Sequence, residues 1–355
     1  MNTINVNTRF NYDVVIGSGL IKSAGSIIHE KQKSGRGCEN VKVLIVADEV
    51  VENYYKTVVS SLADICYKTC LLSLSSGERC KSFEYVEKVL DYLNKNDFQR
   101  EDIIVSVGGG SIGDLVGFVA SIYKRGMRLV HIPTTLLAMI DSAVGGKTAI
   151  NFSDSKNIIG SFYQPNLVIE DIDVLSTIDA KNLHSGVGEL IKYGILNKAI
   201  FYKLFSEVSM KNIENLIVEC IKLKVSYVVQ DEYDLHERHF INLGHTVGHA
   251  IEVLSGFSTP HGIAVASGIM CIAKCCDKAY GTEVSAQIKR VLDIQNIYSD
   301  MPYTAESILT AIKKDKKWSY GKISVVLIDE IGKCRLADFS EDELSVFIRG
   351  GLNEV

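Results

Sequence analysis

The sequence has 355 residues, of which 46% are hydrophobic, and it can therefore bury the core of one large domain or of two. Its formal net charge is −5, with acidic and basic residues intermixed, which argues against a surface that binds nucleic acid or membranes. No stretch reaches the ~18 apolar residues of a membrane span, and the first residues lack a signal-peptide pattern, so we expect a cytoplasmic protein.

Strand-like runs alternate with helical patterns in the first half of the chain. Strands are predicted at residues 12–17, 42–48, 69–74, 103–105, 129–135 and 167–171. A helical pattern begins at Phe83, and Ser82 before it is a plausible N-cap. This alternation predicts a Rossmann-like, mostly parallel sheet with crossover helices. Asp48 ends the second run, at the sheet edge where ligands bind in such folds.

Three consecutive glycines, Gly108, Gly109 and Gly110, separate an apolar strand from a helical pattern. Such a turn lets the backbone approach an anion, and phosphate or pyrophosphate is the natural ligand. The spacing is neither GxGxxG nor a P-loop, so a tight turn without a ligand is the alternative. Polar residues that favour a site follow within fifty positions: Asp114, Arg125, Thr134, Thr135, Asp141, Lys147, Lys156 and Asn157.

The second half of the chain has mainly helical periodicity. Helices are predicted at 183–206, 212–229, 245–255 and 262–280, followed by a hairpin-like segment at 323–332 and a helix from about Glu341. We therefore predict an α/β domain over 1–179 and a mainly helical domain over 180–355. The nine cysteines include no CxxC pair, which favours reduced, buried thiols.

Three histidines lie close together in this helical half. His245 and His249 are one helical turn apart, so they share a helix face, and His261 follows soon after. This spacing alone nominates all three as metal ligands, with Glu252 or Glu189 as a further ligand. Histidines that simply hydrogen-bond inside a helix bundle are the alternative.

Longer motifs follow one another along the chain: GGGSIGD, YKRG, IPTTLLAMIDSAVGGKTAIN, KNIIGSFYQP, GELIKYG, KLKVSYVVQDE, NLGHTVGHAIE and DKK. Together they resemble those of the 3-dehydroquinate synthases, sugar-phosphate cyclases of the shikimate pathway. The resemblance implies conversion of 3-deoxy-D-arabino-heptulosonate 7-phosphate to 3-dehydroquinate and phosphate. The implied steps are transient oxidation by NAD, β-elimination of phosphate, re-reduction and intramolecular aldol closure.

The same resemblance implies the site residues. The metal, Zn²⁺ or alternatively Co²⁺, is assigned to Glu189, His245 and His261. NAD is assigned to Asp48, Glu78, Lys81, Gly109, Gly110, Ser111, Asp114, Thr134, Thr135, Asp141, Lys147, Lys156 and Thr177. Substrate binding and catalysis, including a proton relay at His249, are assigned to His249, Asp141, Lys147, Lys192, Lys224, Arg238, Asn242, Asn157, Arg125 and Lys317. In the family the arginine that matches Arg125 reaches the neighbouring subunit's site, which implies a homodimer.

The chain departs from the family pattern at three places. Ile263 replaces a common glutamate in the HGEAV element, and this is expected to change the surroundings of His261 without removing a ligand. Gly188 replaces the usual alanine before the ligand glutamate. The TLP element reads TID at 177–179, which we expect to affect only a loop.

Other functions remain as alternatives. Sister cyclases make deoxy-inosose, valiolone or amino-dehydroquinate, and a metal-dependent polyol dehydrogenase of related fold would release NADH. A non-catalytic NAD-binding scaffold is a third class. Arg238 with Asn242 favours the carboxylate-bearing heptulosonate, because a guanidinium suits bidentate binding of an anion. These residues do not distinguish a dehydroquinate product from an amino-dehydroquinate product.

Overall fold

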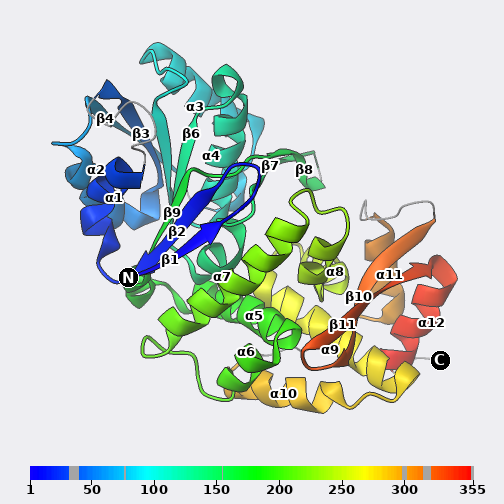
Figure 1. Cartoon of the computed structure of the whole chain (residues 1–355). Helices are drawn as coiled ribbons and strands as arrows, with labels where there is room; N and C mark the ends of the chain where they lie inside the picture. The colour runs from blue at the N-terminus through cyan, green and yellow to red at the C-terminus, as the bar shows by residue number, and fades with distance from the viewer. Residues whose placement is uncertain (32–39, 76, 154, 298–301, 315–320, 353–355) are drawn as a thin grey trace. The chain divides into compact units, whose positions relative to one another are not determined.

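The computed structural model describes residues 1–31, 40–75, 77–153, 155–297, 302–314 and 321–352. The chain divides into two units, Met1–Ile178 and Asp179–Val355 (Figure 1). The first is an α/β unit and the second is mainly helical, which confirms the predicted fold class. Among the described residues, every helix is too short or too polar to cross a lipid bilayer.

A seven-stranded sheet organises the first unit, in the order β1-β2-β9-β6-β5-β3-β4 (Figure 1). Its strands are β1 (Asn2–Val6), β2 (Tyr12–Gly17), β3 (Lys42–Asp48), β4 (Lys68–Leu74), β5 (Ile103–Gly108), β6 (Arg128–Pro133) and β9 (Leu167–Asp171). β1 pairs antiparallel with β2, and the other neighbours pair in parallel, as the alternation of strands and helices predicts. A separate antiparallel hairpin consists of β7 (Lys147–Phe152) and β8 (Ser155–Phe162).

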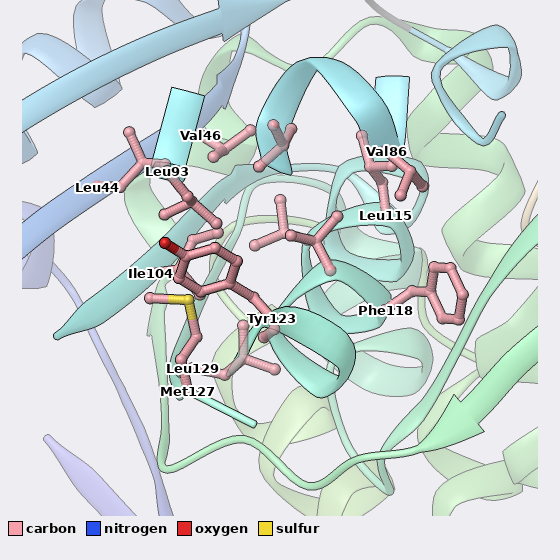
Figure 2. Packing of buried hydrophobic residues seen from close by; sticks show 14 of the residues in the cluster. Leu44, Val46, Val86, Leu93, Ile104, Leu115, Phe118, Tyr123, Met127 and Leu129 are labelled. Atoms are coloured by element: carbon pink, nitrogen blue, oxygen red, sulfur yellow. The ribbon is translucent and has the colours of Figure 1, made fainter. Parts of the chain in front are cut away.

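Helices pack on both faces of this sheet, which explains why β3 and β5 are almost continuously buried. The helices are α1 (Ala24–Lys31), α2 (Glu52–Leu62), α3 (Phe83–Lys95) and α4 (Gly110–Ile122), and the short turns include η4 (Glu78–Cys80), η5 (Tyr123–Arg125), η6 (Ala138–Ser142) and η7 (Ile172–Thr177). Figure 2 shows Leu44 and Ile104 of the sheet packed with Leu93 of α3 and Leu115 of α4. This core holds the start of α4 against the end of β5.

Helix α9 lies at the centre of the second unit, where it packs against α5, α8, α10 and α12. The elements are α5 (Ala180–Leu196), α6 (Lys198–Lys203), α7 (Ile213–Gln230), η8 (Glu237–Asn242), α8 (His245–Leu254), α9 (His261–Tyr280), α10 (Val284–Ile294), α11 (Ala305–Lys314), α12 (Glu341–Leu352) and the antiparallel strands β10 (Lys322–Glu330) and β11 (Lys333–Ser340). Cys271, Cys275 and Cys276 are buried on α9, consistent with the expected core thiols.

Two predicted elements of this unit have different limits in the structure. The helix predicted over 183–206 is two helices, because Asn197 leaves the helical conformation and its Oδ1 accepts the N–H of Ala199 at 2.9 Å, which caps α6. The hairpin predicted over 323–332 covers only β10 and the turn. Its second strand, β11, runs on to Ser340, and β11 alternates weakly in hydrophobicity, so periodicity does not reveal it.

Buried His131 on β6 should make the first unit sensitive to acid. Its Nδ1 lies 2.6 Å from the Oγ of Ser106, and burial lowers its pKa from 6.5 to about 4. Between these two values the unfolded chain takes up a proton that the folded chain does not, so stability falls as the pH falls through this window. We expect the free energy of unfolding to drop by about 2 kcal/mol more between pH 7 and pH 5 than in His131→Gln. Urea unfolding at both pH values measures this, and equal drops in the two proteins would contradict it.

Candidate active site

The carboxyl ends of β3, β5 and β6 are adjacent in the first unit, and the triple glycine lies in the middle of this edge. A Cβ at Gly108 would lie 3.1 Å from the Cβ of both Asp48 and Ile112, and a Cβ at Gly110 would lie 2.8 Å from the Oγ of Ser142. A side chain at Gly108 or Gly110 would therefore require these neighbours to shift. Because α4 begins here, its first N–H groups lie where an anionic group would bind.

The neighbouring strands bring further predicted NAD residues to this edge. Asp48 ends β3 and is 8% exposed, and the N–H of buried Thr134 donates to the carbonyl of Gly108 at 2.9 Å. The methyl group of Thr135 would lie 3.2 Å from a Cβ on Gly109. These side chains therefore lie at the edge where open α/β sheets bind ligands.

Lys81 connects the next group of predicted residues. Its ammonium lies 2.6 Å from Asp114 and 3.8 Å from Glu78, and it also donates to the Oδ1 of Asn157. Burial alone would lower the pKa of Lys81, but the carboxylates of Asp114 and Glu78 outweigh it and raise the pKa. Ser111 donates to Glu78 at 3.2 Å. The structure thus places five predicted residues in one charged network.

Asn151, which is not among the predicted site residues, belongs to the same network. Its Nδ2 donates to Glu78 Oε1 at 2.9 Å, and its Oδ1 accepts the N–H of Asn157 at 2.9 Å. Its own N–H donates to the carbonyl of Lys81 at 2.9 Å. The signal was present in the sequence, since asparagine is uncommon inside a strand such as β7.

Arg125 lies apart from these residues. The thirteen-residue helix α4, which spans about 20 Å, separates it from the glycine turn, so it lies towards the opposite edge of the sheet. Lys124 and Arg125 both have positive φ, at 47° and 64°, in a conformation that costs energy for residues other than glycine.

The remaining predicted residues of the first unit are dispersed around the hairpin and the turns. Asp141 lies in the π-helical turn η6, and such turns are frequent at functional sites. Lys147 and Lys156 are exposed on β7 and β8. The hydroxyl of Thr177 lies 2.6 Å from that of a tyrosine on α2. Lys317, predicted from the DKK motif, lies outside the described residues.

In the second unit, Glu189, His245 and His261 form a group whose ligand atoms all lie within 4.8 Å of one another. Glu189 Oε1 lies 3.6 Å from His245 Nε2 and 3.3 Å from His261 Nε2. Ligand distances of about 2.0–2.2 Å would place the corners of a zinc tetrahedron about 3.3–3.6 Å apart. The donor set and its spacing therefore fit a divalent transition metal.

The surroundings shift the pKa values of the two histidines of this group in opposite directions. Burial lowers the pKa of His245 well below 6.5, despite the nearby carboxylate of Glu189. Desolvation also acts against the charged form of His261, but Glu189 and Glu252 outweigh it and raise its pKa to about 9. A metal ion at its Nε2 would displace a proton, so metal binding here releases protons.

Close backbone contact between α5 and α9 brings Glu189 next to His261. A Cβ at Gly188 would lie 2.1 Å from the carbonyl oxygen of Gly262, and one at Gly262 would lie 1.8 Å from that of Ser185. The departure at Gly188 is thus a packing feature of this chain. It lets Glu189, which follows Gly188, approach His261, which precedes Gly262.

The same device joins α8 to α9. A Cβ at Gly268 would lie 2.2 Å from the carbonyl oxygen of Gly244 and 2.7 Å from the nitrogen of Gly248. Gly244 has φ of 77°, which glycine adopts without strain, and α8 begins directly after it. His245 is therefore held at the start of its helix, against α9.

Glu252 and His249 surround the group. Glu252 Oε2 lies 3.0 Å from His261 Nδ1, so a carboxylate from α8 orients this imidazole even though Ile263 provides none. The ring of His249 lies 5.4 Å from that of His245 and 5.8 Å from that of His261. His249, Glu252 and His261 form a second, overlapping group that meets the same 4.8 Å limit.

Two buried lysines of this unit are predicted to bind the substrate. Lys192 lies one turn after Glu189 on α5, is fully buried and forms an ion pair with it at 2.5 Å. Lys224 on α7 is 4% exposed. A buried ammonium must be compensated by an opposite charge or by hydrogen bonds, which an exposed lysine obtains from water.

Arg238 is also buried, at 1% exposure, in the turn η8. Its guanidinium Nη1 donates to the carbonyl of Glu232 at 2.8 Å, and its backbone N–H donates to the carboxylate of Asp231 at 3.1 Å. Asn242 ends the same turn. The loop thus fixes the guanidinium through part of its donors.

Two family models match the chain. Residues 71–185 match the N-terminal region of 3-dehydroquinate synthase, and residues 186–318 match its C-terminal region. The curated 3-dehydroquinate synthase of Pyrococcus abyssi is 42% identical over 275 residues, 76% of this chain and 82% of that protein. The enzyme of Streptococcus thermophilus is 33% identical over 97% of this chain and 99% of its own length.

Solved structures agree in fold. A 2-deoxy-scyllo-inosose synthase complexed with carbaglucose-6-phosphate, NAD⁺ and Co²⁺ has a TM-score of 0.86 at 24% identity, with 98% of this chain and 99% of that chain covered. A 2-epi-5-epi-valiolone synthase from Streptomyces hygroscopicus with NAD⁺ and Zn²⁺ bound has a TM-score of 0.84 at 23% identity, with 99% of both chains covered. An iron-containing alcohol dehydrogenase, at 14% identity and 96% coverage of this chain and 97% of that chain, reaches only 0.63. With both family models and full-length relatives in agreement, the chain belongs to the 3-dehydroquinate synthase family.

Proposed function

We propose that this chain converts 3-deoxy-D-arabino-heptulosonate 7-phosphate to 3-dehydroquinate and phosphate with bound NAD and Zn²⁺. The observation that carries the proposal is the group formed by Glu189, His245 and His261, whose spacing fits one ion, in a chain of this family. Two imidazoles and one carboxylate leave coordination positions for substrate, as a catalytic site requires. When bound, the ion supplies Lewis-acid polarisation of a substrate oxygen.

We assign the binding of NAD to the sheet edge of the first unit. The N–H groups at the start of α4 would bind the pyrophosphate, and the carboxylate of Asp48 would accept hydrogen bonds from a ribose. Lys81 stays protonated because Asp114 and Glu78 raise its pKa, so it adds a fixed positive charge there. The NAD⁺ in both cyclase structures of similar fold supports this assignment.

The substrate carries a carboxylate and a phosphate, which suit the buried cations. We assign these anions to Lys192, Lys224 and Arg238, with Asn242 as a hydrogen-bonding partner. His249 lies beside the metal group and is assigned a proton relay. Groups held in place by buried contacts reduce the entropy lost in aligning substrate over several steps.

The five remaining assigned residues are four from the first unit and Lys317 from the second. Asp141, Lys147 and Asn157 are assigned to substrate and nicotinamide, and Lys317 to the substrate. We assign Arg125 to the site of a neighbouring subunit in a homodimer. Its distance from the glycine turn along α4 and its positive φ support that assignment.

Direct assay tests the proposed reaction. Purified protein supplied with Zn²⁺, NAD and heptulosonate phosphate should release phosphate and 3-dehydroquinate in equal amounts, with no lasting gain in NADH absorbance. Folded, metal-loaded protein that stays inactive would contradict the proposal. Sustained NADH formation from glycerol would favour a polyol dehydrogenase, and turnover only of the amino analogue would favour an amino-dehydroquinate synthase.

Replacing single histidines should separate metal ligands from substrate residues. His245→Ala should abolish zinc retention after dialysis, because it removes one of three donors. His249→Ala should retain zinc but lose activity. Elemental analysis of both dialysed proteins measures this, and equal loss of zinc would show that His249 is a ligand.

Glu252 should support the metal indirectly, through His261. Glu252→Gln weakens the acceptor for the Nδ1 proton, so we expect zinc affinity to fall by about 10–100-fold. Competition with a chromophoric chelator gives the affinity. Glu306→Gln, an exposed change on α11, is the matched control, and an unchanged affinity in Glu252→Gln would refute the role.

A further inference from the structure

We propose that Asn151 is a positioning residue that couples NAD binding to substrate binding, an inference that rests on the proposed function. It lies on β7, and its side chain contacts Glu78, assigned to NAD, and Asn157, assigned to substrate. Its N–H also fixes the carbonyl of Lys81. One side chain thus links the loop that holds the nucleotide with a residue that faces the substrate.

These contacts close a ring of polar groups. Asn151 donates to Glu78, Glu78 lies 3.8 Å from Lys81, Lys81 donates to Asn157, and the N–H of Asn157 donates back to Asn151. In such a network each bond fixes the geometry of the next. Loss of the Asn151 side chain therefore affects both Glu78 and Asn157.

Glu78 and Asn157 each depend on Asn151 for a separate reason. Asn157 has φ of 53°, a conformation that needs support from its surroundings, and Asn151 provides it by accepting the N–H at 2.9 Å. Without the 2.9 Å bond from Asn151, the carboxylate of Glu78 keeps the 3.2 Å bond from Ser111 and the more distant ammonium of Lys81. Its carboxylate would then turn more freely.

The chemistry also requires an amide rather than an acid. Asn151 is a donor towards Glu78 and an acceptor towards Asn157; a carboxamide serves both at once, whereas an ionised carboxylate can only accept. An aspartate keeps the acceptor but places a second negative charge against the carboxylate of Glu78. A role limited to holding the hairpin would lower stability without changing ligand affinities in this selective way.

Asn151→Asp and Asn151→Ala test the inference in the full chain, with Asn53→Asp as a control at an exposed position on α2. Calorimetric titration gives the dissociation constant for NAD, and steady-state kinetics at saturating NAD give kcat and KM for heptulosonate phosphate. In Asn151→Asp both the dissociation constant and KM should rise by at least tenfold, with kcat within threefold. Asn53→Asp should match the wild type.

Rescue keeps the test decisive if a single variant folds poorly. Asn151→Asp combined with Glu78→Gln reverses donor and acceptor, and it should bind NAD at least threefold more tightly than the two separate losses predict. The inference would be overturned if the double variant lost NAD affinity by the product of the two single losses. It would also be overturned if the NAD dissociation constant of Asn151→Asp stayed within twofold of wild type; neither result would contradict the proposed function. Wild-type protein that binds no NAD would overturn the proposed function and this inference with it.

Discussion

Backbone contact between helices is the constraint on which the convergence of Glu189, His245 and His261 depends. Gly188 and Gly262 let α5 touch α9, and Gly244 with Gly268 lets α8 touch α9. Side chains at these positions would separate the helices by more than the tolerance of a metal site, which is a few tenths of an ångström. The ligand atoms converge because small residues sit beside each of them.

The first unit uses glycine in a related way, but for a different purpose. Gly108 and Gly110 allow β5 and α4 to meet without side chains between them and Asp48 or Ser142. This exposes helix N–H groups at the sheet edge, and the buried network around Lys81 supplies charge nearby. In both units, glycines set the backbone geometry of the candidate site, and in the first unit buried side chains add charge to it.

The sequence predicted much of this fold because its signals are local. Strand runs, the glycine turn and helical periodicity depend on neighbours along the chain. The predicted strands and the glycine turn lie where expected, whereas the helix predicted over 183–206 is two helices. Hydrophobic periodicity does not indicate the break at Asn197, because the cap is a single side chain within an otherwise helical pattern. Spacing also treated His245 and His249 alike, since both lie on one helix face.

Residue spacing does not indicate which side chains from distant parts of the chain come into contact. Glu189 lies more than fifty residues before His245, and the packing of both α5 and α8 on α9 brings them together. The link from Asn151 to Glu78 likewise joins separate segments through side-chain geometry. The family resemblance indicates the proposed ligand set, and the structure shows the contacts that hold these side chains in place.

Crystallography with anomalous scattering at the zinc edge tests the central claim most directly. Zinc should appear as one peak about 2.0–2.2 Å from the donor atoms of Glu189, His245 and His261. A peak among His249, Glu252 and His261 instead, or no peak in folded protein crystallised with excess zinc, would contradict the account.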